Sequence, residues 1–578
     1  MNFNEVAEYF ASIEQTSSRL SMTELFAELL ERATVQEARI ICDLALGQLH
    51  PPYIGTQFNV AEKNSIKVVA ELIHISVEQA SHLLKKEGDI GLLLEQGNWK
   101  VSKDLSVIAV YDRLCAIEKI AGVGSQEEKN QQIASLLQSV EPSAAKYIIR
   151  IIVGKLRLGF SDMTIVDALS WMQVGNKSLR DIVENAYNIC ADIGLIAQTL
   201  KEQGIEALKK MQIQIGIPIL PAAAERLPTA KAIIEKLGPC VAEPKLDGFR
   251  LQIHVDNTGS EPKIAFFSRN LSDMSHMFPD IKKAAMQLPV KTIICEGEAI
   301  VYDADTESFL PFQETVKRKR KHNVEQAAQD MPLQVFVFDL LYLNGNSLLN
   351  NTLKERRRQL TTLFAQSASS IIKSIEERHF TTADDLEAYF NQNISAGLEG
   401  LVVKREDSLY QPGKRNFNWI KLKRQEEGHL DDTIDCVILG YYSGSGKRAS
   451  FGIGAFLVGV YNHQEDLFET VAKVGTGLKD ADWKELKKKC DALQSKTQPH
   501  NVVCNKAVMP DVWCYPEMVC MIRADEITLS PVHTAGKTEK QLGFALRFPR
   551  FMGYREDKSA TESTGITELS SMYKEQFK

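Results

Sequence analysis

The sequence predicts a multidomain protein with an all-α region first, an α+β region in the middle and an all-β region at the end. Apolar residues recur at helical spacing through about the first 212 positions, beginning with Phe3, Val6, Phe10 and Ile13. Strand-like and helix-like runs interleave between about 240 and 424, and short strand-like runs with Gly- and Lys-rich turns follow from about 430. A chain of 578 residues is long enough for several cores of about 100–200 residues each.

Composition and charge are those of an ordinary globular protein. Hydrophobic residues make up 44% and charged residues 25%, and the net charge of −7 argues against a nucleic-acid coat protein. The ten cysteines are scattered and form no C-x-x-C pair, which disfavours a zinc ribbon or a disulfide scaffold and fits a reducing compartment. No apolar run reaches about 18 residues and no signal-peptide profile opens the chain, so we expect an intracellular protein without membrane association.

The helical region contains sequence signals for helix starts and one basic segment. The stretches 21–24, 34–37 and 125–128 each fit a capping box. The segment 146–159 ends a helix in glycines and contains four cations, Lys146, Arg150, Lys155 and Arg157. Exposed backbone N–H groups and cations at such a helix end suit a phosphate backbone, and a solvated helix face is an equally good alternative.

A domain boundary is expected at 213–222, where prolines interrupt an apolar stretch. Strands are predicted beyond it, with a charged helical insert at 353–374 between two of them. The predicted strands of the middle region are 250–255, 263–267, 292–301, 333–343 and 400–404. Strands predicted at 433–442, 455–461 and 518–529 indicate a small antiparallel barrel at the end of the chain.

The stretch 243–250, Glu-Pro-Lys-Leu-Asp-Gly-Phe-Arg, carries the strongest chemical signal. Lys245 precedes a turn-like Asp-Gly and an alternating apolar run, which predicts a lysine on a short turn between two strands. A free lysine has a pKa of about 10.4, and neighbouring cations with partial burial favour the nucleophilic neutral amine. Such a lysine can attack phosphorus or carbonyl carbon and carry a covalent intermediate. Taken alone, the pattern K-x-D-G is better explained as a surface lysine in a hairpin. The residues downstream make the nucleophilic lysine the better explanation.

Polar residues follow in a fixed order at the ends of the predicted strands. They are Ser268-Arg269-Asn270, Glu296-Gly-Glu298, Phe338-Asp339, the run from Glu399 to Lys404, and a stretch from Lys414 and Arg415 to Lys423. In that last stretch, a period of two puts Trp419, Lys421 and Lys423 on one face of a strand.

These residue types suit a nucleoside triphosphate. Lysines and arginines neutralise phosphate oxygens, carboxylates such as Glu298 and Glu399 hold a hard divalent ion or ribose hydroxyls, and an aromatic ring stacks on a base. Phe338 taken alone is better explained as a core residue. The basic run 317–321 indicates a solvated or nucleic-acid-facing stretch, with a nuclear-import signal as the weaker alternative.

In this order the motifs resemble those of the ATP-dependent DNA ligases, in the lysine nucleotidyltransferase superfamily, over nearly the whole chain. The layout is similar to the three-domain archaeal and eukaryotic type. It implies an all-α DNA-binding domain (1–212), an α+β adenylation, or nucleotidyltransferase, domain (213–428) and an all-β OB-fold domain (429–578). Arg547-Phe-Pro-Arg550 resembles the last family motif, and the segment 155–159 resembles part of the DNA-binding domain. Glu296 stands where the family often has Asp, and Ala222-Ala223 replaces Met-Leu, from which we expect changes in local packing only.

The resemblance implies a role for each matched residue. Lys245 becomes the AMP-bearing nucleophile and Glu399 binds metal. The implied ATP contacts are Glu243 and Phe338 with adenine, Arg250, Arg269 and Arg415 with ribose or phosphate, Glu298 with ribose or metal, Lys421 and Lys423 with the α-phosphate, and Arg547 and Arg550 with pyrophosphate. Lys155 and Arg157 are the implied DNA contacts.

The activity implied is the sealing of nicks in duplex DNA during replication, repair and recombination, with ATP and Mg²⁺, or Mn²⁺ as the alternative ion. We expect a monomer in the cytoplasm, associated with the nucleoid, and a sliding clamp is left open as a further partner. An RNA ligase or a capping-type nucleotidyltransferase shares the lysine turn, but the long helical region argues against both. An NAD-dependent ligase needs a zinc module, and the absence of a C-x-x-C pair from this sequence disfavours that alternative. A DNA-binding scaffold with a dead nucleotide site is disfavoured by the intact set of Lys245, Glu298, Glu399 and Lys421.

Overall fold

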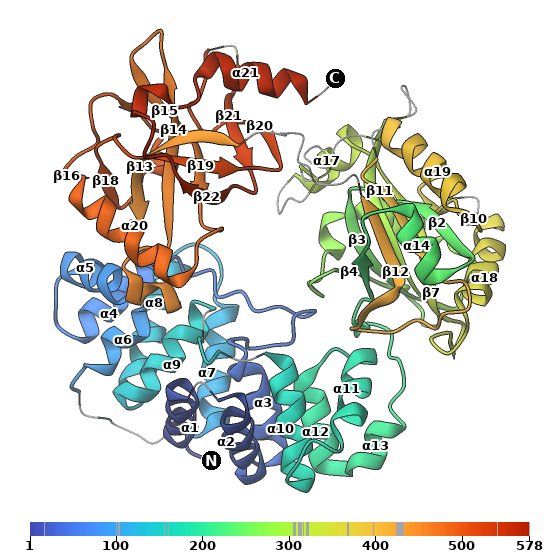
Figure 1. The fold of residues 1–578 in the computed structure, drawn as a ribbon. Helices are drawn as coiled ribbons and strands as arrows, with labels where there is room; N and C mark the ends of the chain where they lie inside the picture. The colour runs from blue at the N-terminus through green and yellow to red at the C-terminus, as the bar shows by residue number, and fades with distance from the viewer. Residues whose placement is uncertain are drawn as a thin grey trace. The chain divides into compact units, whose positions relative to one another are not determined.

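The structure is a computed structural model that describes residues 1–576 except 17, 100, 102–104, 155, 160, 304–307, 310–314, 316, 319–322, 367–368, 397, 424–432, 445 and 540. The chain divides into two compact units. The first unit is formed by Met1–Ala61 and Trp99–Arg424, and the second by Glu62–Asn98 and Gln425–Lys578 (Figure 1). None of the described helices combines the length and the apolar character needed to span a bilayer.

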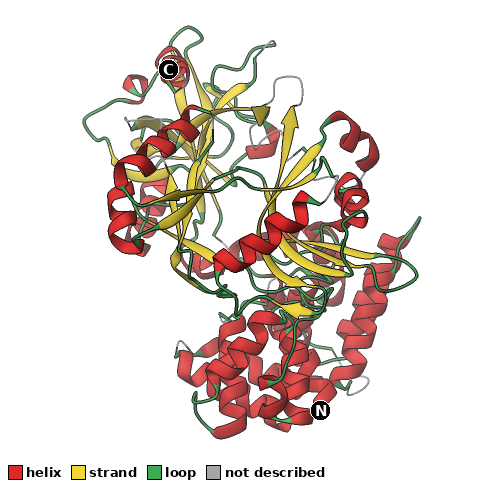
Figure 2. Cartoon of the chain, turned by 90° about the vertical axis from the view of Figure 1, so that its right-hand side faces the viewer, coloured by secondary structure: helices red, strands yellow, loops and turns green. Residues whose placement is uncertain are grey.

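The N-terminal region is built from helices, drawn in red in Figure 2. In the first unit they are α1 (Phe3–Gln15), α2 (Arg19–Arg32), α3 (Val35–Ala45), α7 (Val107–Lys119), α8 (Ser125–Gln138), α9 (Pro142–Ile152), α10 (Asp162–Val174), α11 (Arg180–Ile189), α12 (Ile193–Gln203) and α13 (Ile205–Lys209). The predicted apolar face of α1 is confirmed, because Phe3, Val6, Phe10 and Ile13 are fully buried.

One of the three predicted capping boxes forms as expected. Thr34 and Glu37 cap α3 reciprocally. The other two predictions were wrong: Ser18 caps α2, so Ser21 lies inside that helix, and Gly124 precedes α8, which starts at Ser125 itself. A capping box fixes a helix start only where no better cap lies a few residues earlier, and Ser18 supplies one for α2.

Two sheets form the mixed region of the first unit. Among the described residues the five-stranded sheet has the order β1 (Ala223–Arg226), β12 (Arg415–Lys423), β11 (Gly400–Lys404), β2 (Cys240–Pro244) and β10 (Arg378–Phe380). The seven-stranded sheet has the order β4 (Lys263–Ser268), β3 (Phe249–Asp256), β5 (Thr292–Asp303), β7 (Leu333–Leu343) and β8 (Asn346–Ser347), with β6 (Ser308–Phe309) on β5 and β9 (Ile372–Ser374) on β7.

Helices cover both sheets on their outer sides. The helices of this region are α14 (Ala230–Leu237), α15 (Pro279–Met286), α17 (Val324–Asp330), α18 (Leu353–Ala365) and α19 (Ala383–Ser395). Apolar residues of α14 and α19 share a core with the five-stranded sheet, and those of α15 and α18 share one with the seven-stranded sheet (Figure 1). A smaller cluster contains Ile294 of β5, Leu341 of β7 and Trp419 of β12, so the inner faces of the two sheets meet there.

The strand predictions of this region are largely confirmed, and 333–343 and 400–404 match β7 and β11. The helical insert predicted over 353–374 was too long. Its helix, α18, ends at Ala365, and the β-branched Ile372 begins β9, which pairs in parallel with β7 and buries that side chain.

Strands dominate the described part of 434–554 in the second unit. They are β13 (Ile434–Tyr442), β14 (Ala455–Asn462), β15 (Leu467–Val474), β16 (Gln494–Ser495), β17 (Val502–Val503), β18 (Val512–Cys514), β19 (Val519–Arg523), β20 (Glu526–Ser530), β21 (Gly543–Arg547) and β22 (Arg550–Tyr554). The helices of this unit are α4 (Glu62–Leu72), α5 (Val77–Glu87), α6 (Ile90–Glu95), α20 (Asp480–Ala492) and α21 (Ile566–Glu575). The strand predicted over 518–529 is two strands, because the chain leaves the β13–β19 pairing at Ala524 and Asp525.

We expect Asp339→Asn to lower the unfolding free energy of the α+β region by about 3–5 kcal/mol, because it leaves a buried guanidinium without its counter-charge. Asp339 and Arg356 are both fully buried and joined by two hydrogen bonds of 2.7 and 3.0 Å. Urea unfolding and hydrogen exchange over β7 measure the loss. Glu376→Gln, which breaks an exposed pair with Arg378, should cost no more than about 1 kcal/mol. Equal losses of unfolding free energy in the two variants would contradict the expectation that a buried ion pair matters more than an exposed one.

Candidate active site

A cavity of about 500 Å³ opens between the two sheets of the first unit. It is lined by strand ends and turns of both sheets, including Glu243, Lys245, Arg250, Arg269, Glu298, Phe338, Lys404, Trp419, Lys421 and Lys423. Of the predicted site residues in this region, Glu399 and Arg415 are not part of the lining. Glu399 still reaches the cavity, because its carboxylate contacts Lys245. Arg415 is exposed at the start of β12.

Lys245 lies on the turn through which the chain passes from one sheet to the other. β2 of the five-stranded sheet ends at Pro244, and β3 of the seven-stranded sheet begins at Phe249, which confirms the predicted turn. Gly248 packs so closely on β5 that a Cβ atom there would lie 2.3 Å from the carbonyl oxygen of Ala299. Only glycine allows this approach, and it holds Lys245 at the mouth of the sheet pair.

The nearest charged partner of Lys245 is an anion. Its Nζ contacts Oε2 of Glu399, and the Nζ of Lys423 lies 3.3 Å from the same oxygen. Burial raises the pKa of the Glu399 carboxyl, but Lys245 and Lys423 outweigh burial and lower it. The amine therefore contacts an anion, Glu399, in addition to the cations that were predicted near it.

Cations gather on the inner face of β12. Lys421 and Lys423 line the cavity with Trp419, as the period of two predicted. Burial lowers the pKa of Lys421, and the charges of Lys423, Arg415, Lys245 and Arg269 lower it further. This concentration of positive charge is the environment that a triphosphate needs.

Glu298 faces the cavity from β5, opposite Arg250 in the register of β3 and β5. Its Oε1 accepts a hydrogen bond of 3.2 Å from the backbone N–H of Gly248. Burial raises the pKa of Glu298 to about 7, although Lys245 and Arg250 act in the opposite direction. The structure thus keeps a carboxylate where its charged form is disfavoured, which is typical of functional sites.

Glu243 lies at the buried end of the cavity, 2% exposed. Its Oε2 is 2.6 Å from the Nζ of Lys404, and Arg357 lies 3.9 Å from Oε1. Oε1 has no hydrogen-bond partner among the described residues. Burial raises the pKa of this carboxyl, and Lys404 and Arg357 offset only part of that effect. An acceptor of this kind suits a ligand that brings a donor group, such as an exocyclic amine.

Phe338 is both a core residue and part of the cavity wall. It packs against core residues and also lines the cavity. The Nζ of Lys404 lies 4.9 Å, and the guanidinium of Arg250 5.4 Å, from its ring centroid. Both cations are close enough to attract the ring and so fix its position in the cavity wall.

Arg547 and Arg550 belong to the second unit, at the ends of β21 and β22. Arg547 is paired with Glu526 and Arg550 with Asp525, 3.1 Å away, and all four side chains are at least 27% exposed. Both arginines are therefore held by surface ion pairs.

The basic segment of the helical region differs from its prediction. Lys146 and Arg150 are buried and pair with Glu14, so they do not form a solvated face. Burial raises the pKa of Glu14, but these two cations and Tyr147 lower it to about 2. Arg157 is partly exposed with φ at 66°, and Lys155 lies outside the described residues. The period of a helix does not distinguish a cation facing solvent from one facing a buried glutamate.

Sequence reasoning missed the positions that hold the site in place. Glu296, from which only packing differences were expected, is 1% exposed and accepts hydrogen bonds from Arg250 and Tyr410. Lys404 and Arg357 both approach Glu243. The available signal was a charged residue inside an apolar strand, which is rarely buried without a partner.

The donor set fits a divalent ion that arrives with a phosphate ligand. Glu298 and Glu399 are hard oxygen donors near Lys245, and no group of three or more His, Cys, Asp or Glu side chains with metal-binding geometry occurs among the described residues. Mg²⁺ is commonly held by one or two carboxylates plus substrate phosphates rather than by a cage of protein ligands.

Three family models match the chain in order. "DNA ligase N terminus" matches residues 2–170, "ATP dependent DNA ligase domain" matches 221–423, and "ATP dependent DNA ligase C terminal region" matches 449–558. A "Probable DNA ligase" of Dictyoglomus turgidum is 43% identical over 582 residues, covering 100% of this chain and 98% of that protein. "DNA ligase 2" of Thermofilum pendens is 39% identical and covers 100% and 98%.

A solved structure titled "Pmar-Lig_PreS3" has the same fold, with a TM-score of 0.56, 17% identity, and coverage of 95% of this chain and 99% of that one. The family models and the curated relatives define an enzyme that joins DNA strands at the expense of a nucleotide. The chain belongs to the ATP-dependent DNA ligase family. Its architecture is that of the family: a helical N-terminal region, a central adenylation domain and a strand-rich C-terminal domain.

We expect Glu298→Gln to stabilise the free enzyme at pH 8 and to have much less effect at pH 5. The folded pKa of about 7 lies above the unfolded value of about 4.3, so the folded state holds this proton more tightly. Stability contributed by the group is therefore full below the unfolded pKa and falls as pH rises through about 7. Thermal unfolding at both pH values measures the difference, with the exposed Glu387→Gln as control. A stabilisation that grows as pH falls would overturn the assignment.

Proposed function

We propose that this DNA ligase seals nicks in duplex DNA with Lys245 as the residue that carries AMP. The activity follows from the family, and one observation supports the assignment to Lys245. Its amine lies at the junction of the two sheets, beside a cavity of about 500 Å³ that is lined by cations and by a buried carboxylate with a free acceptor oxygen. A triphosphate, a base and a nucleophile can meet there.

The chemistry needs three displacements at phosphorus. The neutral Nζ of Lys245 bonds to the α-phosphorus of ATP, and pyrophosphate leaves as the bond to the β-phosphate oxygen breaks. The 5′-phosphate of the nick then attacks the same phosphorus, and the Lys245–phosphorus bond breaks. Finally the 3′-hydroxyl bonds to the 5′-phosphorus, loses its proton and releases AMP.

Lys245 becomes nucleophilic when Glu399 turns away from it. Once Glu399 has turned away, the amine loses its proton to solvent, and the charges left around it are Lys421 and Lys423. These cations hold the α-phosphate and stabilise the charge that spreads onto phosphate oxygens.

The other residues orient ATP. Glu243 accepts from the adenine amine through its unpaired Oε1, and Phe338 stacks on the base. Arg250, Arg269 and Arg415 contact ribose or phosphate. Glu298 and Glu399 hold Mg²⁺, or Mn²⁺ in its place, which supplies charge neutralisation at the phosphate oxygens.

Each region then has one task. Residues 1–212, an all-α domain, bind the duplex through its backbone with contacts such as Lys155 and Arg157, so binding is salt-sensitive. Residues 213–428 catalyse adenylation. Residues 429–578 form an OB-fold whose short antiparallel strands, such as β13, β14 and β15, support that assignment. The enzyme works as a monomer on nicked DNA in the nucleoid of the cytoplasm, and a sliding clamp is a candidate partner.

Lys245→Ala should abolish covalent labelling by ATP that carries a tagged α-phosphate, because no other group forms the phosphoramide bond. Gel electrophoresis of the denatured protein and mass spectrometry of the peptide with residue 245 measure the label. Lys282→Ala, which removes an exposed lysine of α15, is the control and should label normally. Normal labelling of Lys245→Ala would refute the assignment.

Arg550→Ala should slow self-adenylation by at least about tenfold while sealing by pre-adenylated enzyme changes little. The reason is that the arginines of the last motif orient pyrophosphate in the first step and leave when DNA docks. Single-turnover assays of each step measure the two rates, and Lys574→Ala provides a surface cation of the same region as control. If sealing slows while adenylation does not, the arginine acts in the wrong step for this proposal.

A further inference from the structure

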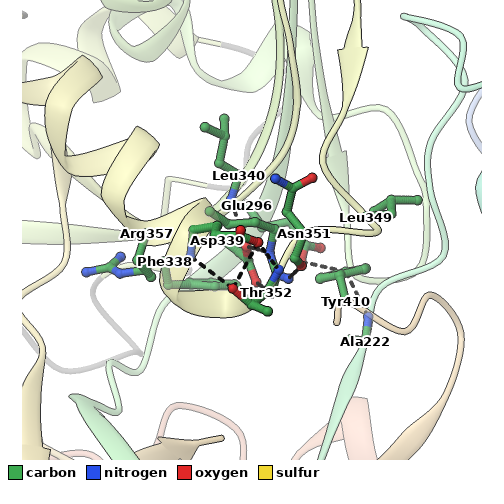
Figure 3. A network of polar contacts seen from close by, with 12 residues as sticks. Ala222, Glu296, Phe338, Asp339, Leu340, Leu349, Asn351, Thr352, Arg357 and Tyr410 are labelled. Carbon is green, nitrogen blue, oxygen red and sulfur yellow. Dashed lines mark hydrogen bonds and ion pairs between the residues drawn. The ribbon is translucent and has the colours of Figure 1, made fainter. Parts of the chain in front are cut away.

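One buried hydroxyl, that of Tyr410, bonds to a carboxylate side chain and to a backbone N–H group whose residues lie far apart in the sequence. Tyr410 lies in the loop between β11 and β12 and is 3% exposed. Its hydroxyl donates to Oε2 of Glu296 at 2.7 Å and accepts from the backbone N–H of Ala222 at 2.9 Å. Figure 3 shows the Tyr410 ring between these two residues, with dashed lines to both.

The same two residues hold the guanidinium of Arg250. Its Nη2 donates to Oε2 of Glu296 at 2.9 Å, and its Nη1 donates to the carbonyl oxygen of Ala222 at 2.7 Å. Arg250 lines the cavity, 18% exposed, while its Nε has no hydrogen-bond partner among the described residues. Both anchors of this arginine are therefore fixed by a single hydroxyl.

Packing fixes Tyr410 in turn. The guanidinium of Arg356 lies 5.7 Å from the Tyr410 ring centroid, and the Trp419 ring meets it edge to face at 5.8 Å. Arg356 also donates to the carbonyl oxygen of Asn351 at 2.7 Å while paired with the buried Asp339. The Tyr410 ring is thus held between Arg356, which belongs to a buried ion pair, and Trp419, which lines the cavity.

The opposite side of Glu296 is held as well. Its Oε1 lies 3.5 Å from the Nε2 of Gln252, which also donates to the carbonyl oxygen of Ile219 at 2.9 Å. The backbone N–H of Ile219 donates to the Oε1 of Gln252 at 2.8 Å. The segment 219–222, which leads into β1, is therefore tied to β3 and β5 by buried polar groups.

We propose that Tyr410 is a positioning residue for the adenylation step, acting through Glu296 and Ala222 on the orientation of Arg250. The proposal rests on the proposed role of Arg250 as a contact to ATP.

Removal of the Tyr410 hydroxyl has three consequences. The N–H of Ala222 loses its acceptor, Oε2 of Glu296 loses a donor, and the two anchors of Arg250 are no longer tied to each other. A buried donor without an acceptor is unstable, so the segment at Ala222 shifts to find one and carries its carbonyl oxygen, the partner of Nη1, with it.

The test is a double-mutant cycle on self-adenylation by the full-length enzyme with ATP and Mg²⁺. Tyr410→Phe should lower kcat/KM by about five- to tenfold, the loss expected when one hydrogen bond of ordinary strength is removed. The loss should divide between KM and kcat in the same proportion as in Arg250→Ala. In the Arg250→Ala background, Tyr410→Phe should have no further effect beyond about twofold, because coupled residues are not additive.

Tyr147→Phe is the matched control. Tyr147 is also fully buried and donates to a carboxylate, Glu14, at 2.8 Å, but it lies in the helical region. It should lower thermal stability and leave adenylation unchanged. Glu296→Gln, which keeps the shape of the side chain, provides a second variant and should reproduce the division between KM and kcat seen for Tyr410→Phe.

The outcomes distinguish an error in the proposed contact between Arg250 and ATP from an error in the proposed role of Tyr410. If Arg250→Ala adenylates normally, the proposed contact between Arg250 and ATP is wrong. If Arg250→Ala is impaired and the effect of Tyr410→Phe multiplies with it in the double variant, Tyr410 has only a structural role and the inference is overturned. The same holds if Tyr410→Phe lowers stability as Tyr147→Phe does and leaves kcat/KM of adenylation unchanged.

Discussion

The site depends on the close approach of one turn to one strand. Residues 245–248 carry the chain from the five-stranded to the seven-stranded sheet, and Gly248 lies against the backbone of Ala299 with no room for a Cβ atom. Because the turn crosses between sheets, the lysine on it faces side chains of both. Glu399 and Lys423 come from the first sheet and Glu298 from the second, and these residues meet only where the sheets meet. The charged surroundings of Lys245 are thus a consequence of sheet packing.

Charge inside this domain is organised by pairing. Asp339 with Arg356, Glu243 with Lys404, and Glu296 with Arg250 are each buried on the carboxylate side. A buried carboxylate with one partner removed is costly, so each pair fixes the position of both members. Arg250, Phe338 and Glu243 therefore line the cavity in positions that are set before any ligand binds, which reduces the ordering that binding requires.

The sequence predicted the parts of this arrangement that depend on local pattern. The Asp-Gly turn after Lys245 and the apolar runs of β7 and β11 are local signals, and they were located closely. What it did not predict depends on which distant group a side chain meets. Lys146 and Arg150 have the helical spacing of a basic surface but face Glu14, which lies more than a hundred residues away in the sequence. Glu296 looked like a conservative replacement because its partners, Arg250 and Tyr410, are joined to it only by the fold.

The two sets of cationic residues proposed to act on ATP are held with different strength, and the difference matches their tasks. Arg250 is anchored by a buried glutamate and a buried carbonyl oxygen, and it serves a site that keeps one geometry. Arg547 and Arg550 are held by exposed carboxylates of their own unit, and such surface pairs contribute only about 0–1 kcal/mol. Residues that orient the leaving group in one step and withdraw in the next must exchange partners at little cost. A buried ion pair would hold them in one state, whereas a surface pair lets the triphosphate compete for them.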